Sequence, residues 1–568
     1  MAYFLKKANQ SNNLYLAIYE SYYSPEIKGT RHRCYKSLGS ITALKKKGIE
    51  DPIAFYQKEV DKLNEERKKN EDDQSRKYIS ERSPIRYLGY FPLDAIMRKL
   101  DMKKYIDFFK LNTSFDYDLY DILCALIYAR SVKPCSKHKT FHEVIPCLYK
   151  DYDFSYDQLL NALDYYGNDY EKFIELFTGQ VKEKYLLDTS ITYFDCTNFY
   201  FEIDREDDFR RKGPSKENRK DPIVGMGLLL DANQIPIGMK LYPGNESEKP
   251  LMREVIDSLK SQNNIEGRTI HVADKGLNCA RNIYFSKKNK DGYLFSKSVK
   301  QLPGKEKVWV LLKNDYKDVK DSKGNILYSY KSCIDKFPYV YEDEKKEKHT
   351  FELTEKRLVT YNPDLSRKKR YEINRMVEKA KELTLSKAKK SEYGEASKYV
   401  TFSSTSKGEI TEDKVKVTIN EKAIEEDLKL AGYNLLVTSE IKMKDKDIYD
   451  TYHNLWRIEE SFKIMKSDLD ARPVFLQKEN TIKGHFFICY VTVLLERIFQ
   501  FIELKNEFSS NDIYSFFKEF KVVKDDHINI NITSSNDFIK ALAQKTKLPI
   551  LNSRLNDKQI KKVLEYKL

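Results

Sequence analysis

The sequence ITYFDCTNFYF occupies residues 191–201 and places one aspartate among aromatic and β-branched residues. Such a composition predicts a mostly buried central strand. Further strands are expected at 223–230, which is continuously apolar, and at 235–242. A helix at about 248–261 and a short strand at 269–273 follow. Three strands with short connections can form an antiparallel meander and the fourth can pair alongside after a crossover, so we predict an α/β core with a mixed sheet.

Composition limits the class of protein. The 568 residues include 101 Lys and Arg against 87 Asp and Glu, a formal net charge of +14, and a basic excess indicates a polyanionic partner, usually nucleic acid. Charged residues make up 33% of the chain, and apolar stretches such as 486–495 are expected to be too short to span a bilayer, so no membrane association is predicted. The N-terminal sequence MAYFLKKANQ lacks the apolar core of a secretory signal, and a cytoplasmic location is expected.

Changes of pattern along the chain predict six segments. Residues 1–43 alternate polar and apolar positions, which predicts a small β-unit, and 300–430 interrupts the core with β-like stretches such as 308–312. A long helix is expected from about 445 to 469. The predicted boundaries are 1–80 for the β-unit and a connecting helix, 81–184 for a helical DNA-binding domain, 185–299 for the first part of the core, 300–430 for an insertion, 431–505 for the second part of the core, and 506–568 for a C-terminal region.

One group of cysteines and histidines has a spacing that suits a metal. Cys135, His138, His142 and Cys147 follow the pattern C-x2-H-x3-H-x4-C, which is compatible with tetrahedral zinc. The alternative is a loop that opens a helix holding the two histidines. Because no CxxC pair accompanies the group, the loop and helix are the favoured interpretation.

Two aspartates stand out for their positions on predicted strands. Asp195 lies inside the buried central strand, where a carboxylate is expensive unless it is paired, metal-bound or hydrogen-bonded to backbone at a bulge. Asp274 follows the short strand at 269–273 and precedes a Lys-Gly pair. The carboxyl end of a strand is a common place for chemistry in α/β folds, although an Asp there can also cap a helix or close a turn.

Helical geometry distinguishes two adjacent glutamates. A buried stripe is predicted to run along the late helix, because its apolar residues step by three and four positions. Glu459 falls on the flank of that stripe and can reach an interior site, whereas Glu460 points nearly away and is expected to be solvated. The stripe consists of Leu455, Ile458, Phe462, Met465 and Leu469.

Asp195, Asp274 and Glu459 together form a candidate metal site. An all-oxygen cage suits Mg²⁺ or Mn²⁺, which prefer hard carboxylate ligands. Two such ions can activate a nucleophile and stabilise the leaving oxygen of a phosphodiester. The order of these residues, on a strand, at a strand end and on a late helix, is more specific than any one of them.

These residues resemble the DDE insertion-sequence transposases. Within that family the sequence is similar to the group with a Tyr-x2-Arg-x3-Glu-x6-Lys signature, since Tyr452, Glu459 and Lys466 match the spacing, whereas Leu455 stands at the Arg position with Arg457 nearby. The resemblance is carried by YFDCT at 193–197, GPSK at 213–216, PGN at 243–245, VADKG at 272–276, WRIE at 456–459 and RPVF at 472–475.

The resemblance implies a fold and a set of roles. The fold is an RNase H-like mixed sheet with helices on both faces, interrupted by a β-rich insertion, with N-terminal β and helical DNA-binding units and a helical C-terminal region. Asp195, Asp274 and Glu459 hold two divalent metal ions per active site, hydrolyse the ends of the mobile element and drive the attack of the 3′-OH on target DNA. The implied partners are double-stranded DNA at the element ends and the target, and a second copy of the chain in a homodimer. DNA contacts are expected from Tyr452, Lys466, Lys216, Arg472 and Arg457.

Two alternatives stay open beside a transposase. One is an RNase H-like DNA endonuclease without strand transfer. The other is a DNA-binding derivative that has kept the fold and lost the chemistry, against which the three intact carboxylates argue. The long insertion and the N-terminal helical segment favour a transposase over a minimal nuclease.

Overall fold

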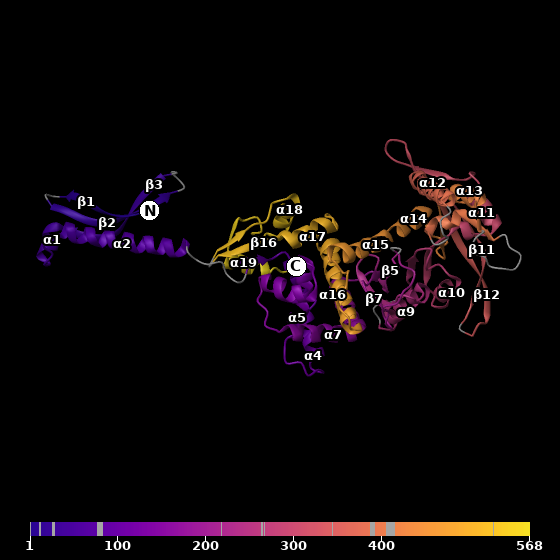
Figure 1. The fold of residues 1–568 in the computed structure, drawn as a ribbon, viewed down its shortest axis with the longest axis horizontal. Coiled ribbons are helices and arrows are strands. Elements are labelled where there is room, and N and C mark those ends of the chain that lie inside the picture. The colour runs from indigo at the N-terminus through magenta and orange to yellow at the C-terminus, as the bar shows by residue number, and fades with distance from the viewer. Residues whose placement is uncertain are drawn as a thin grey trace. The chain divides into compact units, whose positions relative to one another are not determined.

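The computed structural model describes residues 2–10, 13–24, 29–75, 83–216, 219–262, 265, 267–343, 345–386, 392–404, 415–525 and 528–568. The chain divides into two compact units, an N-terminal unit Met1–Ser83 and a main unit Pro84–Leu568. Figure 1 shows the elements of each unit.

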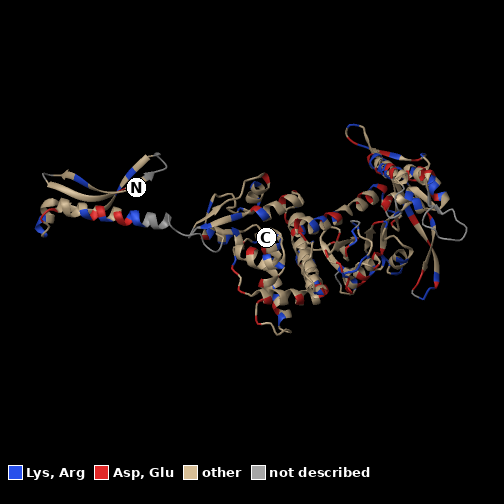
Figure 2. Cartoon of the chain, viewed as in Figure 1, with Lys and Arg blue, Asp and Glu red and all other residues tan. Residues whose placement is uncertain are grey.

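The N-terminal unit is a three-stranded antiparallel sheet with two helices. The order of the strands in the sheet is β1-β2-β3. Leu16 and Ile18 alternate onto the buried face of the sheet, and the long helix buries Val60. Acidic and basic residues are intermixed along that helix (Figure 2). The elements are β1 (Tyr3–Gln10), β2 (Asn13–Ser24), β3 (Gly29–Ser40), α1 (Ile41–Lys46) and α2 (Pro52–Ser75).

The main unit begins with a helical segment that packs on a late helix, α16 (Glu479–Arg497). The backbones of α7 and α16 meet directly, because a Cβ on Gly167 would lie 1.7 Å from the carbonyl oxygen of Asn480. In Figure 1, α16 runs between this helical segment and the strands of the core. The elements are β4 (Ile85–Tyr87), α3 (Phe91–Lys99), α4 (Met102–Lys110), α5 (Leu119–Val132), α6 (Lys137–Lys139), η1 (Thr140–Val144), η2 (Ile145–Cys147), α7 (Tyr156–Asn168) and α8 (Tyr170–Tyr185).

The core of the main unit is an RNase H-like mixed sheet. Its first three strands form an antiparallel meander in the order β7-β6-β5, and the next two strands pair parallel to β5 on its other side, in the order β5-β8-β9. The predicted order of three strands, helix, strand, helix and strand is confirmed. The elements are β5 (Ile191–Tyr200), β6 (Ile223–Leu230), β7 (Pro236–Pro243), α9 (Glu248–Ser261), β8 (Ile270–Ala273), α10 (Ala280–Lys288) and β9 (Gly292–Lys297).

Strands of the insertion extend the same sheet. The order continues from β9 through β15 and β12 to β11 and β10, so the sheet has nine strands within the described residues. The prediction of a strand at 308–312 is wrong, because Val308 and Val310 lie in the helix α11. Val308 is exposed and Val310 is buried. The added elements are η3 (Val299–Gln301), α11 (Gly304–Leu311), β10 (Lys317–Lys320), β11 (Ile326–Glu342), β12 (Lys348–Tyr361), α12 (Pro363–Leu385), η5 (Gly394–Tyr399), β13 (Val400–Ser404), β14 (Val415–Ile419), α13 (Glu421–Leu430) and β15 (Tyr433–Thr438).

Successive residues of the central strand face two different cores. Tyr193 belongs to the larger core with α15 (Trp456–Lys463) and α16, whereas Phe194 packs with apolar residues of α9 and α10. Alternation along the strand therefore places Asp195 on the Tyr193 face. Helices cover both faces of the sheet, as the resemblance implies.

The prediction of a single long helix at 445–469 is wrong. The chain forms α14 (Asp445–His453), α15 (Trp456–Lys463) and the π-helical η6 (Ile464–Asp468) instead. Asn454, a poor helix former, ends α14, and the amide of Leu455 bonds the carbonyl of Tyr452 in a tight turn. The predicted stripe from Leu455 to Leu469 is nevertheless buried throughout.

An apolar helix and a small sheet complete the main unit. The helix Glu479–Glu503 is long and apolar enough to cross a membrane, so the apolar segment is longer than the predicted stretch 486–495. However, 89% of its most apolar window is buried inside the protein, as in a core helix. The C-terminal region is not only helical, because β16, β17 and β18 form a sheet with β4. The elements are η7 (Ile498–Glu503), α17 (Ser510–Glu519), β16 (Lys521–Asp525), β17 (Ile528–Asn531), α18 (Asp537–Thr546), β18 (Arg554–Asn556) and α19 (Asp557–Leu564).

Candidate active site

Two carboxylates lie side by side at the carboxyl edge of the parallel strands. In the β5–β8 pair Phe194 is opposite Ala273, so Asp195 and Asp274 occupy the next position on adjacent strands. In the β8–β9 pair Ala273 is opposite Phe295, which adds Ser296 to the same row. Neighbouring strands are about 4.8 Å apart. The register therefore brings together two aspartates that are far apart in the sequence.

Each aspartate also bonds backbone close to itself. Asp195 Oδ1 accepts the amide of Cys196 at 2.8 Å, and Asp274 Oδ1 accepts the amide of Gly276 at 2.6 Å. No register shift occurs along β5 at Asp195, so it does not sit at a bulge. The pKa of Asp195 is raised to about 7, because burial and the carboxylates of Asp274 and Glu248 together outweigh the lowering by Lys216 and the amide bond. A buried carboxylate crowded by like charges favours a bound cation.

Glu248 is a fourth carboxylate at this edge, and the sequence analysis did not identify it. Lys216 Nζ lies 3.8 Å from Asp195 Oδ1 and 3.8 Å from Glu248 Oε1, and it also donates to the carbonyl of Cys196. Burial lowers the pKa of Lys216, but Asp195 and Glu248 outweigh this effect and the net shift is upward. Lys216 thus supplies the positive charge between the two acids.

A close backbone approach delivers Lys216 to the site. A Cβ on Gly213 would lie 1.8 Å from the carbonyl oxygen of Gly244, so only glycine fits there. This contact holds the loop before Lys216 against the turn before α9, where Glu248 begins the helix after its N-cap Ser247. The signal in the sequence was an acidic residue at a helix start beside the PGN turn.

The hydroxyl of Tyr452 lies near all three predicted acids, Asp195, Asp274 and Glu459. The pKa of Tyr452 is raised to about 12, mainly by burial and also by the carboxylates of Asp274, Asp195 and Glu459, while a hydrogen bond with Ser296 opposes the shift. Ser296 is the next member of the row that holds the two aspartates. Helix α15, which carries Glu459, packs against β5. All three predicted acids therefore lie close enough to the Tyr452 hydroxyl to raise its pKa.

The carboxylate oxygens of Asp195, Asp274 and Glu459 do not all lie within 4.8 Å of one another. Across the described parts of the chain, one group of three or more potential metal ligands has its ligand atoms within 4.8 Å of one another, and it is Asp343, Glu347 and His349 beside the β11–β12 turn. Glu459 is exposed. Lys216 lies beside Asp195, with its Nζ 3.8 Å from Asp195 Oδ1. The donor set of carboxylate oxygens nevertheless fits a hard divalent ion.

The expectation that Glu460 is solvated is wrong, because two arginines hold its carboxylate. Its Oε2 accepts hydrogen bonds from Arg497 and Arg457, both at 3.1 Å, and Arg497 is completely buried. The guanidinium of Arg457 also lies 3.9 Å from the ring centroid of Trp456. The helical projection placed Glu460 away from the buried stripe but could not include α16, whose Arg497 covers that side.

The other basic residues lie near the end of β5. Lys466 Nζ is 5.4 Å from the ring centroid of Phe199, and the Arg472 guanidinium is 5.2 Å from that of Tyr200. These rings are the last residues of β5, four and five positions after Asp195. Leu455, at the position of the signature arginine, is buried. Two of the predicted DNA contacts thus lie at the end of the strand that carries Asp195, whereas the buried Leu455 offers no contact to DNA.

The predicted zinc alternative does not form. The rings of His138 and His142 are tilted by 45° with their centroids 4.4 Å apart, and Cys135 Sγ contacts Thr140 Oγ1 at 3.4 Å. All four residues of the motif are described, and no three of them bring ligand atoms within 4.8 Å of one another. The loop-and-helix interpretation is the one the structure supports.

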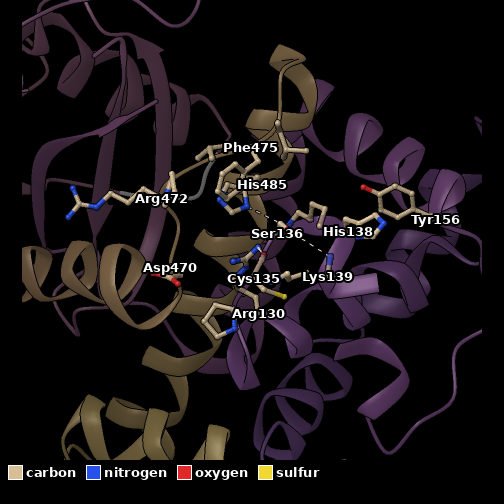
Figure 3. Close-up of a pocket in the computed structure, with 15 residues that line it drawn as sticks. Arg130, Cys135, Ser136, His138, Lys139, Tyr156, Asp470, Arg472, Phe475 and His485 are labelled. Carbon is tan, nitrogen blue, oxygen red and sulfur yellow. Dashed lines mark hydrogen bonds between the residues drawn. The ribbon is translucent and has the colours of Figure 1, made fainter. Parts of the chain in front are cut away.

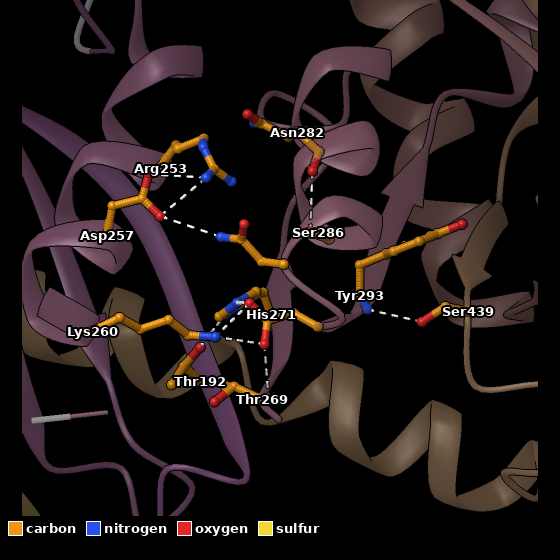
Figure 4. A network of polar contacts seen from close by, with 12 residues as sticks. Thr192, Arg253, Asp257, Lys260, Thr269, His271, Asn282, Ser286, Tyr293 and Ser439 are labelled. Carbon is orange, nitrogen blue, oxygen red and sulfur yellow. Dashed lines mark hydrogen bonds and ion pairs between the residues drawn. The ribbon is translucent and has the colours of Figure 1, made fainter. Parts of the chain in front are cut away.

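A buried polar network fixes the opposite ends of the same strands (Figure 4). His271 on β8 bonds Thr192 of β5 at 2.8 Å and Asp291 at 3.3 Å, and Lys260 bonds Asp291 at 2.6 Å. Burial lowers the pKa of His271, and although burial alone would raise the pKa of Asp291, the bonds from His271 and Lys260 lower it. The network ties β5 to β8 and so supports the register of the two aspartates.

Comparison with known protein families agrees with this geometry. A family described as the transposase DDE domain matches residues 188–495, more than half of the chain. The matched range contains Asp195, Asp274 and Glu459. No curated protein matches the chain.

Proposed function

Because the chain belongs to the transposase DDE domain family, we propose that it is the transposase of an insertion sequence. It binds the terminal inverted repeats, cleaves the DNA at the element ends and joins them to target DNA. The observation that carries this proposal is the pairing of β5 with β8, whose register places Asp195 and Asp274 next to each other at the carboxyl edge of the sheet.

Asp195, Asp274 and Glu459 are the residues that would hold divalent metal. The family generally uses divalent ions, and two Mg²⁺ or Mn²⁺ ions fit an oxygen donor set. When bound, such ions activate the attacking water or 3′-OH and stabilise the leaving oxygen. Glu248 lies close enough to Asp195 to share Lys216 with it, and we include it as a carboxylate that supports the site.

The remaining residues position the DNA. Lys466 and Arg472 lie at the end of β5 and provide positive charge for phosphates beside the cleaved bond. Tyr452 offers a hydroxyl donor at the same place. Lys216 neutralises Asp195 and Glu248 in this structure, so it has to move or share them when a cation enters.

The subgroup with the Tyr-Arg-Glu-Lys signature is part of the proposal. Tyr452, Glu459 and Lys466 occupy three of its four positions, and buried Leu455 replaces the fourth. Arg457 does not take over that role in this arrangement, because Glu460 and Trp456 hold its guanidinium. The enzyme acts as a homodimer on the two element ends, in the cytoplasm.

The test is incubation with Mg²⁺ and labelled DNA that carries the ends of the element. A transposase yields nicked or hairpin ends and then joined products. Ends that are cleaved but never joined would favour the endonuclease alternative. The Asp195→Asn variant should bind the same DNA and leave it intact. Binding without cleavage by the wild-type protein, with Mg²⁺ or Mn²⁺, would refute the proposal.

A further inference from the structure

A cavity of about 630 Å³ lies between the helical segment and the chain that leads into α16 (Figure 3). Its wall includes Arg472, whose guanidinium is 5.2 Å from the ring of Tyr200 at the end of β5. The cavity is therefore continuous with the region that we propose contacts DNA. Its cationic and imidazole lining consists of Arg130, Lys137, His138, Lys139, Arg472 and His485.

Three of these nitrogen-bearing side chains are buried. Arg130, Lys137 and His485 are 4%, 6% and 4% exposed. Arg130 donates to the carbonyls of Leu469 at 3.2 Å and Cys135 at 2.9 Å. Lys137 Nζ lies 3.4 Å from His485 Nδ1, and the other nitrogen of that ring is 3.1 Å from a carbonyl.

No carboxylate balances this charge. In the described part of the chain neither Arg130, Lys137 nor His485 forms an ion pair, and Asp470, the acidic residue of the lining, is exposed. Burying a cation without a counter-ion is expensive. Burial and the nearby Arg130 lower the pKa of Lys137 to about 7, which is the physical sign of that missing partner.

We propose that this cavity binds a phosphate group of the DNA held by the protein. Lys137 is the buried donor, and a phosphate would supply the negative charge that its surroundings lack. Arg472 connects the cavity lining to the end of β5, and Phe475 in the same lining is 71% exposed. A phosphate is preferred to a carboxylate ligand because it supplies more acceptor oxygens to several donors at once. This inference rests on the proposed function for the source of the phosphate.

The experiment compares full-length wild type with Lys137→Gln, Lys137→Arg and the control Lys133→Gln. Lys133 follows α5, has a side chain 51% exposed and does not line the cavity. Binding of an element-end duplex is measured by fluorescence anisotropy between 50 and 300 mM salt, in EDTA so that cleavage plays no part. Thermal unfolding is measured with inorganic phosphate against chloride at equal ionic strength.

We expect Lys137→Gln to lower the salt slope of duplex binding by about 1, the value for one lost phosphate contact. It should also abolish the stabilisation by inorganic phosphate, whereas Lys137→Arg retains both responses. Lys133→Gln should retain the stabilisation by phosphate. The melting temperature in chloride shows whether each variant is folded.

Three results would overturn parts of the inference. Loss of the phosphate response with an unchanged DNA slope would exclude DNA as the source and leave free phosphate as the ligand. Unchanged responses in both assays would exclude the site altogether. If the wild-type protein binds no element-end DNA, the proposed function fails, and the phosphate assay still tests the cavity separately.

Discussion

Two adjacent glutamates should respond to the same substitution in opposite ways. Glu459→Gln changes an exposed carboxylate that faces Tyr452, and Glu460→Gln changes a carboxylate that bonds Arg457 and the fully buried Arg497. The first substitution should abolish cleavage and leave stability unchanged. The second should lower stability and leave cleavage in place.

The size of the stability effect follows from the contacts. Removing one partner of a fully buried ion pair costs ~3–5 kcal/mol. Glu460 is 22% exposed, glutamine keeps one acceptor oxygen, and Glu496 Oε2 also lies 3.7 Å from Arg497 Nε. We therefore expect the free energy of unfolding to fall by about 2 kcal/mol, which is within the range for the loss of one hydrogen bond to a charged group. In a unit the size of Pro84–Leu568 this corresponds to about 2 °C in melting temperature. A surface change such as Glu459→Gln stays within about 0.5 kcal/mol.

The assay pairs thermal unfolding by circular dichroism with single-turnover cleavage of labelled element ends in Mg²⁺. Wild type and both variants are measured in the same buffer, and DNA binding is checked in EDTA. Glu459→Gln should bind DNA and fail to cleave it, and Glu460→Gln should melt earlier and still cleave at temperatures below its transition. The reasoning is refuted if Glu459→Gln cleaves at the wild-type rate while Glu460→Gln is inactive and fully stable.

Three further predictions concern the hydroxyl, the buried network and the net charge. Tyr452→Phe keeps the ring and removes the donor, so cleavage in single-turnover assays should fall about 10-fold to 100-fold with an unchanged melting temperature, and a wild-type rate would argue against the role of the hydroxyl. Asp291→Asn leaves Lys260 and His271 without their acceptor charge and should cost about 3 kcal/mol in unfolding experiments. With a net charge of +14, DNA affinity should fall ~10³-fold to 10⁵-fold between 50 and 200 mM salt if six to ten phosphates are neutralised, and a flat response would exclude a large DNA interface.

Local patterns were enough to predict the core sheet. Apolar runs, short connections and one crossover define the order of β5 to β9, and the register then follows from which face is buried. The row of Asp195, Asp274 and Ser296 is a consequence of that register. The stripe from Leu455 to Leu469 was also predictable, because helical periodicity is a property of the sequence alone.

Contacts between distant segments were not predictable in the same way. Lys137 and His485 are 348 positions apart, and nothing in either neighbourhood indicates that they meet. Glu460 was assigned from its own helix, but Arg497 on α16 determines its environment. Glu248 reaches the site because the backbones of Gly213 and Gly244 are in contact, and the sequence around neither glycine predicts this contact. Tertiary packing likewise overrides local propensity where the β-branched residues of α11 form a helix.

The most direct test of the central claim measures metal-dependent cleavage by aspartate variants. Wild type, Asp195→Asn and Asp274→Asn are incubated with labelled element ends in Mg²⁺ or Mn²⁺, and the reaction of each is followed beside its DNA binding in EDTA. If the carboxylates hold the catalytic ions, both variants bind DNA and neither cuts it. Cleavage at the wild-type rate by either aspartate variant would contradict the account.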